Sequence, residues 1–104
     1  MCVSLGYAQA APEVDAKLEA ELERYLQLTN RDQTAAAALL QSLAPQITAL
    51  TPPATKVRFN IYLSGQRALE KNYPAADRLL QENWQIAEQA QDPDIWAEVL
   101  AEHL

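Results

Sequence analysis

The stretch that decides the fold is residues 57–91, which read VRFNIYLSGQRALEKNYPAADRLLQENWQIAEQAQ. Apolar residues recur every three to four positions on both sides of a short polar turn at 71–73. Pro74 follows this turn, and proline suits the first position of a helix because an N–H there has no intrahelical partner anyway. The stretch therefore predicts a helical hairpin, with one helix over about 55–70 and the next over about 74–91.

Three further helices are expected around this hairpin. The first covers about 13–29 and has one apolar stripe, formed by Val14, Leu18, Leu22 and Tyr25/Leu26. The second begins near residue 33, and its alanine- and leucine-rich pattern continues to Leu50. The last follows residue 91, and its apolar set is Ile95, Trp96, Val99, Leu100 and Leu104.

Polar residues and prolines mark the ends of these helices. Asn30 is expected to end the first helix, and Asp32 and Asp92 have side chains suited to cap the helices that follow them. Pro45 lacks an N–H and should kink or split the second helix near Ala44. The prolines at 52 and 53 predict a stiff break before the central hairpin.

Three further expectations concern which parts of the helices are buried and which are exposed. The helix over 55–70 is apolar on several sides, which is typical of a helix that lies between neighbours. Gly65 costs about 1 kcal/mol relative to alanine inside a helix, so we expect the closest approach of two helices at the Ser64–Gly65 pair. The carboxylates of Glu19, Glu21 and Glu23 are interpreted as a solvated face of the first helix.

The composition disfavours several classes of function. The chain has 104 residues, a net charge of −6 and 2 glycines; this favours one small helical domain and disfavours nucleic-acid or anionic-lipid binding. Cys2 and His103 are the only cysteine and histidine, so we expect neither a structural zinc site nor a serine–histidine–aspartate triad. No apolar run reaches the roughly 18–20 residues of a membrane span, so this segment is not expected to insert into a membrane.

Pairs of carboxylates are the remaining candidates for catalysis. Asp92 and Asp94 are better explained by helix capping, and Asp77 and Glu82 by solvation. An active site also needs a pocket with a nucleophile, a metal or a perturbed acid. We therefore expect no enzyme and no cofactor.

Residues 1–12 differ from the rest of the chain because they are mostly small and apolar. Ala8-Gln9-Ala10 has the small-x-small pattern that signal peptidase reads, but the positive region and the longer apolar core of a complete signal peptide are missing. Two interpretations stay open. A signal-peptide remnant implies a periplasmic or otherwise exported domain, whereas a disordered N-terminus is compatible with the cytoplasm.

A short pattern recurs in the second and fourth helices. Ala36, Leu39 and Leu40 match Ala76, Leu79 and Leu80 at an offset of 40 residues. This offset falls in the range of helical-hairpin repeats. Helices one and two would form one unit, helices three and four a second, and the last helix would open a third.

The second unit resembles a tetratricopeptide repeat (TPR). Five positions carry the residue type that the TPR motif has there: Leu63, Ser64, Tyr73, Ala76 and Leu80. Four depart from it: Asn60, Arg67, Lys71 and Asn83 replace an aromatic residue, a tyrosine, a glycine and an alanine. We therefore expect an all-α fold of about five helices, in which antiparallel hairpins stack as a short TPR-like right-handed solenoid over 13–104 and the array is truncated.

A longer resemblance extends over the second half of the chain. It rests on the runs Thr51-Pro52-Pro53, 59–65, 72–80 and 91–101. Together they resemble the N-terminal helical-repeat region of bacterial membrane-bound signalling proteins, notably GGDEF-type diguanylate cyclases. In that family a signal peptide precedes the repeats, and a membrane span and a cytoplasmic cyclase domain follow them. No GGDEF residues occur here, so the resemblance implies no cyclase activity for this chain.

The function expected from these features is that of a sensor or protein-interaction module. Helical arrays bind proteins or peptides along a concave surface, and Arg58 and Tyr62, one turn apart, are candidate partner-binding residues with Trp96 at the open end. Packing or ordinary solvation is the alternative for each residue. The last helix is still amphipathic at Leu104, which predicts self-association or a need for more chain. The alternative function is a stand-alone cytoplasmic TPR-like adaptor or regulator fragment.

Overall fold

The computed structural model describes residues 15–103, with side chains up to Ala101. Five α-helices occupy this part of the chain: α2 (Ala16–Thr29), α3 (Gln33–Leu43), α4 (Pro53–Leu69), α5 (Tyr73–Ala90) and α6 (Pro93–His103). A 3₁₀ turn, η1 (Ala44–Gln46), follows α3. The all-α fold is thus confirmed. The expectations for residues 1–12, Val14 and Leu104 lie outside the described residues.

Side-chain caps fix where the helices begin. Asp15 accepts hydrogen bonds from the backbone N–H groups of Lys17 and Leu18, so α2 starts two to three residues later than expected. The Asp32 carboxylate accepts from the Ala35 N–H at 3.1 Å, and Asp92 accepts from the Asp94 N–H at 2.9 Å. Both caps were expected from the sequence. Each carboxylate satisfies a donor that would otherwise lack a partner in the first turn.

Prolines mark the end of α3 and the start of α4, because proline lacks an N–H to donate within a helix. α3 ends at Leu43, and Pro45 lies in η1, so the predicted split near Ala44 is confirmed. α4 begins at Pro53 rather than at residue 55, because proline is tolerated in the first turn. Leu50 is 93% exposed and lies outside the helices. Its expected place in the apolar stripe of the second helix is therefore wrong, because the helical pattern stops at the proline.

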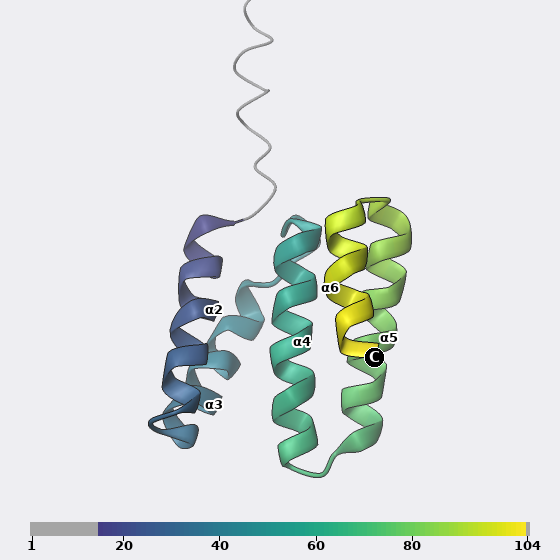
Figure 1. Ribbon diagram of the computed structural model, residues 1–104. Helices are drawn as coiled ribbons and strands as arrows, with labels where there is room; N and C mark the ends of the chain where they lie inside the picture. Colours follow the sequence, from purple (N-terminus) through teal and green to yellow (C-terminus); the bar gives the residue numbers. More distant parts are fainter. Residues whose placement is uncertain (1–14, 104) are drawn as a thin grey trace, which may run out of the picture.

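The helices form antiparallel pairs that lie side by side (Figure 1). α2 pairs with α3, α4 pairs with α5, and α6 returns beside α4. α4 contacts every other helix of the described chain, which agrees with its apolar residues on several sides. α2, α4 and α6 run in the same direction along one side of the molecule.

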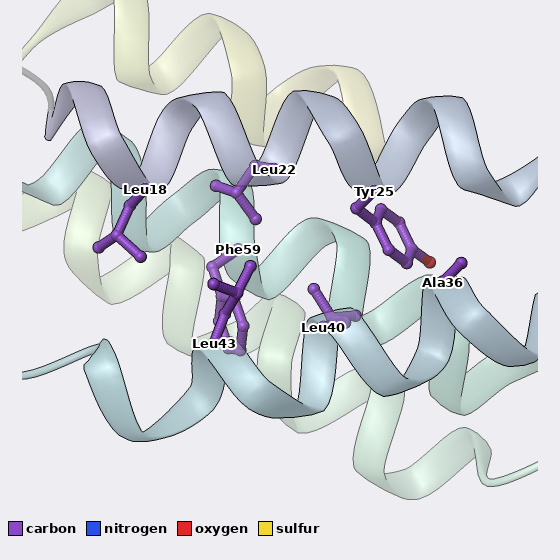
Figure 2. Packing of buried hydrophobic residues seen from close by; sticks show 7 residues of the cluster. All are labelled: Leu18, Leu22, Tyr25, Ala36, Leu40, Leu43 and Phe59. Carbon is purple, nitrogen blue, oxygen red and sulfur yellow. The ribbon is translucent and has the colours of Figure 1, made fainter.

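Two hydrophobic cores lie on either side of α4. The first joins α2, α3 and α4 (Figure 2), and its buried members are Leu18, Leu22, Tyr25, Ala36, Leu40, Leu43 and Phe59. The second joins α4, α5 and α6 through Val57, Ala87, Ile95 and Val99. Phe59 and Val57 thus point from one helix into different cores. The buried leucine, valine, isoleucine and phenylalanine side chains of these cores contribute about 1.5–3 kcal/mol apiece.

A buried amide pair fastens α4 to α5. The Asn60 Nδ2 donates to Asn83 Oδ1 at 3.0 Å, and the Asn83 Nδ2 donates to the Val57 carbonyl at 3.1 Å. Asn83 is 1% exposed, whereas its neighbour Trp84 is 38% exposed. Asn83 therefore occupies the buried side of α5 because its amide finds partners across the helix contact.

The expected close approach at Gly65 is wrong. Gly65 is exposed, and a Cβ placed on it would meet no atom within 4 Å. It lies two turns after Arg58 on the same side of α4, away from the contact with α5. Ser64 is buried, and its hydroxyl donates to the Ile61 carbonyl at 2.7 Å. Of the Ser64–Gly65 pair, only Ser64 lies against a neighbour.

Candidate functional site

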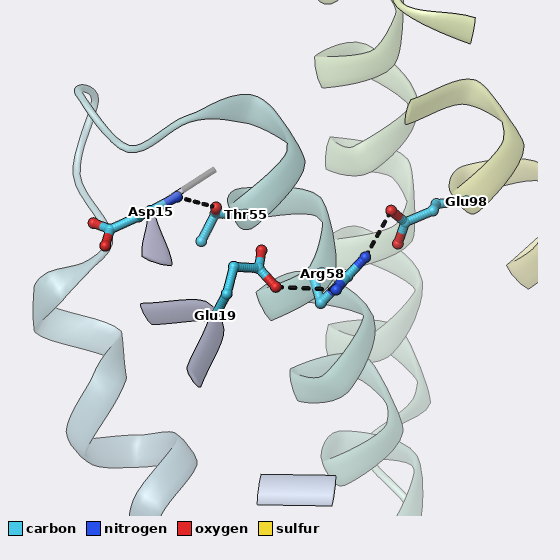
Figure 3. A network of polar contacts seen from close by, with 5 residues as sticks. All are labelled: Asp15, Glu19, Thr55, Arg58 and Glu98. Atoms are coloured by element: carbon cyan, nitrogen blue, oxygen red, sulfur yellow. Dashed lines mark hydrogen bonds and ion pairs between the residues drawn. The ribbon is translucent and has the colours of Figure 1, made fainter. Parts of the chain in front are cut away.

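Arg58 lies at the centre of the side formed by α2, α4 and α6. Its guanidinium donates to Glu19 Oε1 of α2 at 3.0 Å and to Glu98 Oε1 of α6 at 2.9 Å (Figure 3). The Arg58 side chain remains 36% exposed. One cation thus connects three helices that are far apart in the sequence.

Carboxylates outnumber cations around Arg58. Two carboxylates share a single guanidinium, and Glu23 acts on the same region through its charge. Burial lowers the pKa of Arg58, but the hydrogen bond and charge of Glu98 and the charge of Glu19 outweigh it and raise the pKa. Arg58 therefore stays protonated in a region whose net charge is negative.

The Glu19 side chain is less exposed than its place on an acidic helix suggests. Its side chain is 18% exposed, Oε1 accepts from Arg58, and Oε2 is buried with no hydrogen-bond partner among the described residues. The expectation that Glu19 belongs to a solvated face is therefore wrong. The α4 helix packs over this side of α2, and Arg58 compensates the charge that this packing covers.

A second contact fixes the top of the same α2–α4 boundary. The Asp15 backbone N–H donates to Thr55 Oγ1 at 3.1 Å (Figure 3), and Thr55 is fully buried. One turn farther along α4, Arg58 reaches Glu19. The start of α2 and the first two turns of α4 are thus held together by two polar contacts.

Tyr62 lies one turn beyond Arg58 and stacks on Tyr25. The two ring centroids are 5.4 Å apart with 23° between the ring planes. The Tyr25 hydroxyl donates to Gln66 Oε1 at 3.2 Å. Burial raises the pKa of Tyr62, Arg58 lowers it, and the carboxylates of Glu23, Glu19 and Glu98 raise it further.

Arg58 and Tyr62 line one cleft between α4 and α6. The cleft has a volume of about 240 Å³, and its lining residues are Arg58, Ile61, Tyr62, Glu98 and Ala101. It offers a cation, a carboxylate, a phenol and an apolar floor. This set of groups is suited to bind one or two side chains of a partner.

Trp96 does not belong to this cleft. Its ring meets Trp84 of α5 edge to face, with centroids 4.9 Å apart and 85° between the planes. Trp96 also packs against the second hydrophobic core. The structure thus brings two of the three candidate residues together and places the third elsewhere.

Sequence reasoning did not select Glu19 and Glu98 as part of this site. The spacing could have pointed to them, because Glu19, Arg58 and Glu98 are separated by 39 and 40 residues. The second of these spacings equals the offset at which Ala36 and Ala76 match, and the first differs from it by one residue. Glu19, Arg58 and Glu98 lie on α2, α4 and α6, so opposite charges at this spacing coincide with contacts between every second helix.

Metal ligands and carboxylate pairs are the other groups considered among the described residues. They contain no group of three or more His, Cys, Asp or Glu side chains that could hold a metal ion. Asp77 accepts from Gln81 at 3.1 Å, and both Asp77 and Glu82 are exposed. Within the same residues, no helix has the length and apolarity that crossing a membrane requires.

Comparisons with known proteins give no relative. No family model matches the sequence, and neither the curated proteins nor the solved structures contain a match.

Proposed function

We propose that this chain is a non-catalytic helical-repeat module that recognises a protein or peptide on the side formed by α2, α4 and α6. We propose further that it is the N-terminal sensor part of a bacterial membrane-bound signalling protein such as a diguanylate cyclase. The observation that carries the first proposal is the cleft in which Arg58 and Tyr62 lie together. The second proposal rests on the sequence resemblance.

The spacing of contacts between helices supports a repeat architecture. Asp15 and Thr55 are 40 residues apart, as are Arg58 and Glu98, and Glu19 and Arg58 are 39 apart. The starts of α3 and α5, at Gln33 and Tyr73, have the same offset. The Tyr25–Gln66 hydrogen bond has an offset of 41. Contacts at offsets this similar are expected of stacked repeats, because each unit touches near-equivalent positions of its neighbour.

Crosslinking from the cleft tests the binding proposal. A photoreactive p-benzoylphenylalanine replaces Ala101, which is exposed and lines the cleft, in bacterial cells that produce the chain. The control places the same group at Ala20, an exposed alanine of α2 outside the cleft. We expect a discrete protein adduct from position 101 and none from position 20. No adduct from position 101, or equal adducts from both positions, would contradict the proposal.

The alternative is a stand-alone cytoplasmic adaptor or regulator fragment. Both functions would use the same cleft, so the compartment separates them. Fusion of the authentic upstream sequence and this chain to alkaline phosphatase, which is active only after export, gives a direct measurement. Phosphatase activity supports the exported sensor, and its absence in cells that contain the intact fusion supports the cytoplasmic adaptor.

Self-association through α6 is a further part of the proposal. Trp84, Trp96 and Leu100 lie on neighbouring turns of α5 and α6, and Leu100 is 43% exposed. Apolar side chains that gather on one surface favour contact with another protein surface. A second copy of the chain is the occupant that we propose.

A further inference from the structure

A groove runs between α3 and α5 on the side of α4 away from Arg58. α3 and α5, both wholly within the described residues, do not contact each other. The floor between them is a stripe of α4 with helical spacing, formed by Lys56, Asn60, Leu63 and Arg67. We refer to this depression as the α3–α5 groove.

Three hollows make up this groove. The largest has about 490 Å³ and lies between α4 and α5 over Leu63, Arg67, Arg78 and Leu79. A second, of about 90 Å³, shares Leu63 and Arg67 and continues to α3. A third, of about 270 Å³, shares Glu82 with the first and ends at Lys56. The first hollow thus adjoins both of the others, through Leu63 and Arg67 on one side and through Glu82 on the other.

The groove is locally basic in an acidic protein. The chain has 8 Lys and Arg residues against 14 Asp and Glu residues. Lys56, Arg67 and Arg78 line the groove, whereas its carboxylates are those of Glu70 and Glu82. Three cations against two carboxylates give the groove the opposite sign to the whole chain.

The α3 wall carries no charge. No Asp, Glu, Lys or Arg occurs between Asp32 and Lys56, so α3, η1 and the following loop are uncharged throughout. Ile47 of this segment is partly buried and also lines the groove, and the buried Leu40 lies beneath it. Depletion of charged residues together with aliphatic side chains is a mark of the central part of a protein interface.

The three cations are accessible to a partner. Arg78 is exposed and Lys56 is partly buried, and neither has an ion-pair partner among the described residues. Arg67 pairs with Glu70 at 3.0 Å, but both side chains are substantially exposed, at 31% and 48%. Exposed pairs of this kind contribute about 0–1 kcal/mol, so a partner carboxylate can replace Glu70 at little cost.

We propose that the α3–α5 groove binds an acidic segment of a partner protein that has aliphatic residues between its carboxylates. The aliphatic side chains would cover Leu63 and Leu79, and the carboxylates would pair with Lys56 at one end and with Arg67 and Arg78 at the other. Lys56 and Arg67 are separated by about 16 Å along the axis of α4. Two carboxylates about five residues apart in an extended segment span the same length. This site is independent of the Arg58 cleft and does not rest on the proposed function.

The test uses a fluorescein-labelled synthetic peptide with two glutamates about five residues apart and leucines between them. A matched peptide has glutamine in place of each glutamate. Binding to the complete chain is measured by fluorescence anisotropy, and the site is located by amide NMR shifts. We expect the glutamate peptide to bind at least about tenfold more tightly, more weakly as salt rises, with the largest shifts at the groove residues.

Charge reversal supplies the matched variants. Arg78→Glu and Lys56→Glu should each weaken binding of the glutamate peptide by about tenfold or more, because attraction becomes repulsion. Arg31→Glu is the control, since Arg31 is exposed and lies outside the groove. Tyr62→Phe should leave peptide binding unchanged, which separates this site from the Arg58 cleft.

Several results would overturn the proposal. They are equal binding of the two peptides, no binding up to millimolar concentration, an equal loss in Arg31→Glu, or shifts confined to α2 and α6. A self-associating chain that Arg78→Glu converts to monomers would also overturn it, because a second copy would then be the occupant of the groove.

Discussion

The guanidinium of Arg58 holds one carboxylate from α2 and one from α6. Replacement by alanine leaves Glu19 largely buried with no cation beside it. We expect Arg58→Ala to lower the free energy of unfolding by about 1–3 kcal/mol, the usual cost of a buried polar group that loses its partner. Urea denaturation followed by circular dichroism measures this change.

Arg67→Ala is the matched control for Arg58→Ala. Arg67 also pairs with a glutamate at 3.0 Å, but within one helix turn, and that glutamate is 48% exposed, whereas Glu19 is 18% exposed. Its loss should change stability by less than about 1 kcal/mol. Equal effects of the two substitutions would mean that Arg58 is an ordinary surface ion pair.

Tyr62 makes stability depend on alkaline pH. Burial raises its pKa in the folded state, so the phenol of the unfolded chain loses its proton first, at about pH 10. The contribution of the neutral Tyr62 phenol to the free energy of unfolding is complete below that pH. It is lost as the pH rises toward the higher pKa of the folded state. Tyr62→Phe should therefore lose less stability than the wild type between about pH 9 and 11. Urea titrations at each pH measure this, and an equal loss of stability in the variant and the wild type would contradict it.

Lys71 adopts a left-handed backbone conformation with φ of 63° in the turn between α4 and α5. Most L residues are strained there, whereas glycine is not, and the TPR motif has glycine at this position. We expect Lys71→Gly to raise the melting temperature and to stabilise the chain by up to about 1 kcal/mol. Gln27→Gly is the control, because Gln27 is an exposed residue inside α2, where glycine should destabilise the chain by about 1 kcal/mol. A loss of stability in Lys71→Gly would refute the assignment of strain.

Between elements, the amides of Asn60 and Asn83 set how α4 lies on α5. Asn83→Ala leaves the buried Asn60 amide without its acceptor and should cost about 1–3 kcal/mol. In the double variant with Asn60→Ala, no orphaned amide remains, so the loss should be smaller than the sum of the two single losses. A double-mutant cycle from urea denaturation gives the coupling, and strict additivity would show that the pair does not act as a unit.

Helix ends could be predicted from the sequence because they depend on near neighbours. Asp32, Pro45 and Asp92 act within a few residues of themselves, and each terminates or caps a helix where expected. The surroundings of Glu19 and Gly65 could not be predicted in the same way. Glu19 is covered by a helix that comes from 39 residues away, and Gly65 faces no neighbouring atom within 4 Å of a Cβ, which only the tertiary arrangement decides.

The candidate site could likewise be predicted only where it depends on residues within one helix. The one-turn spacing of Arg58 and Tyr62 placed both on one side of α4, and they do line one cleft. Trp96 was grouped with them only by its position in the last helix, and its ring instead meets Trp84. Periodicity within a helix predicts which residues share a side, but it does not predict which neighbouring helix that side meets.

At the scale of the whole molecule, α4 is the element on which both cores depend. Phe59 belongs to the core with α2 and α3, and Val57 belongs to the core with α5 and α6. The Arg58 cleft and the α3–α5 groove lie on the two remaining sides of the same helix. One helix thus separates two candidate binding surfaces of different charge, so a partner on either surface would contact the centre of the fold.

The surface of α5 and α6 carries the last prediction, which concerns self-association. Leu100 is 43% exposed close to the Trp84–Trp96 pair, whereas Leu50 is 93% exposed in a loop far from it in the sequence. If copies associate through α6, Leu100→Glu places a charge in the contact and should shift the sedimentation coefficient to that of a monomer. Leu50→Glu adds the same charge outside the contact and should sediment as the wild type does. A wild-type chain that stays monomeric up to about millimolar concentration, where the free energy of association would be weaker than about −4 kcal/mol, or equal behaviour of the two variants, would contradict self-association through this surface.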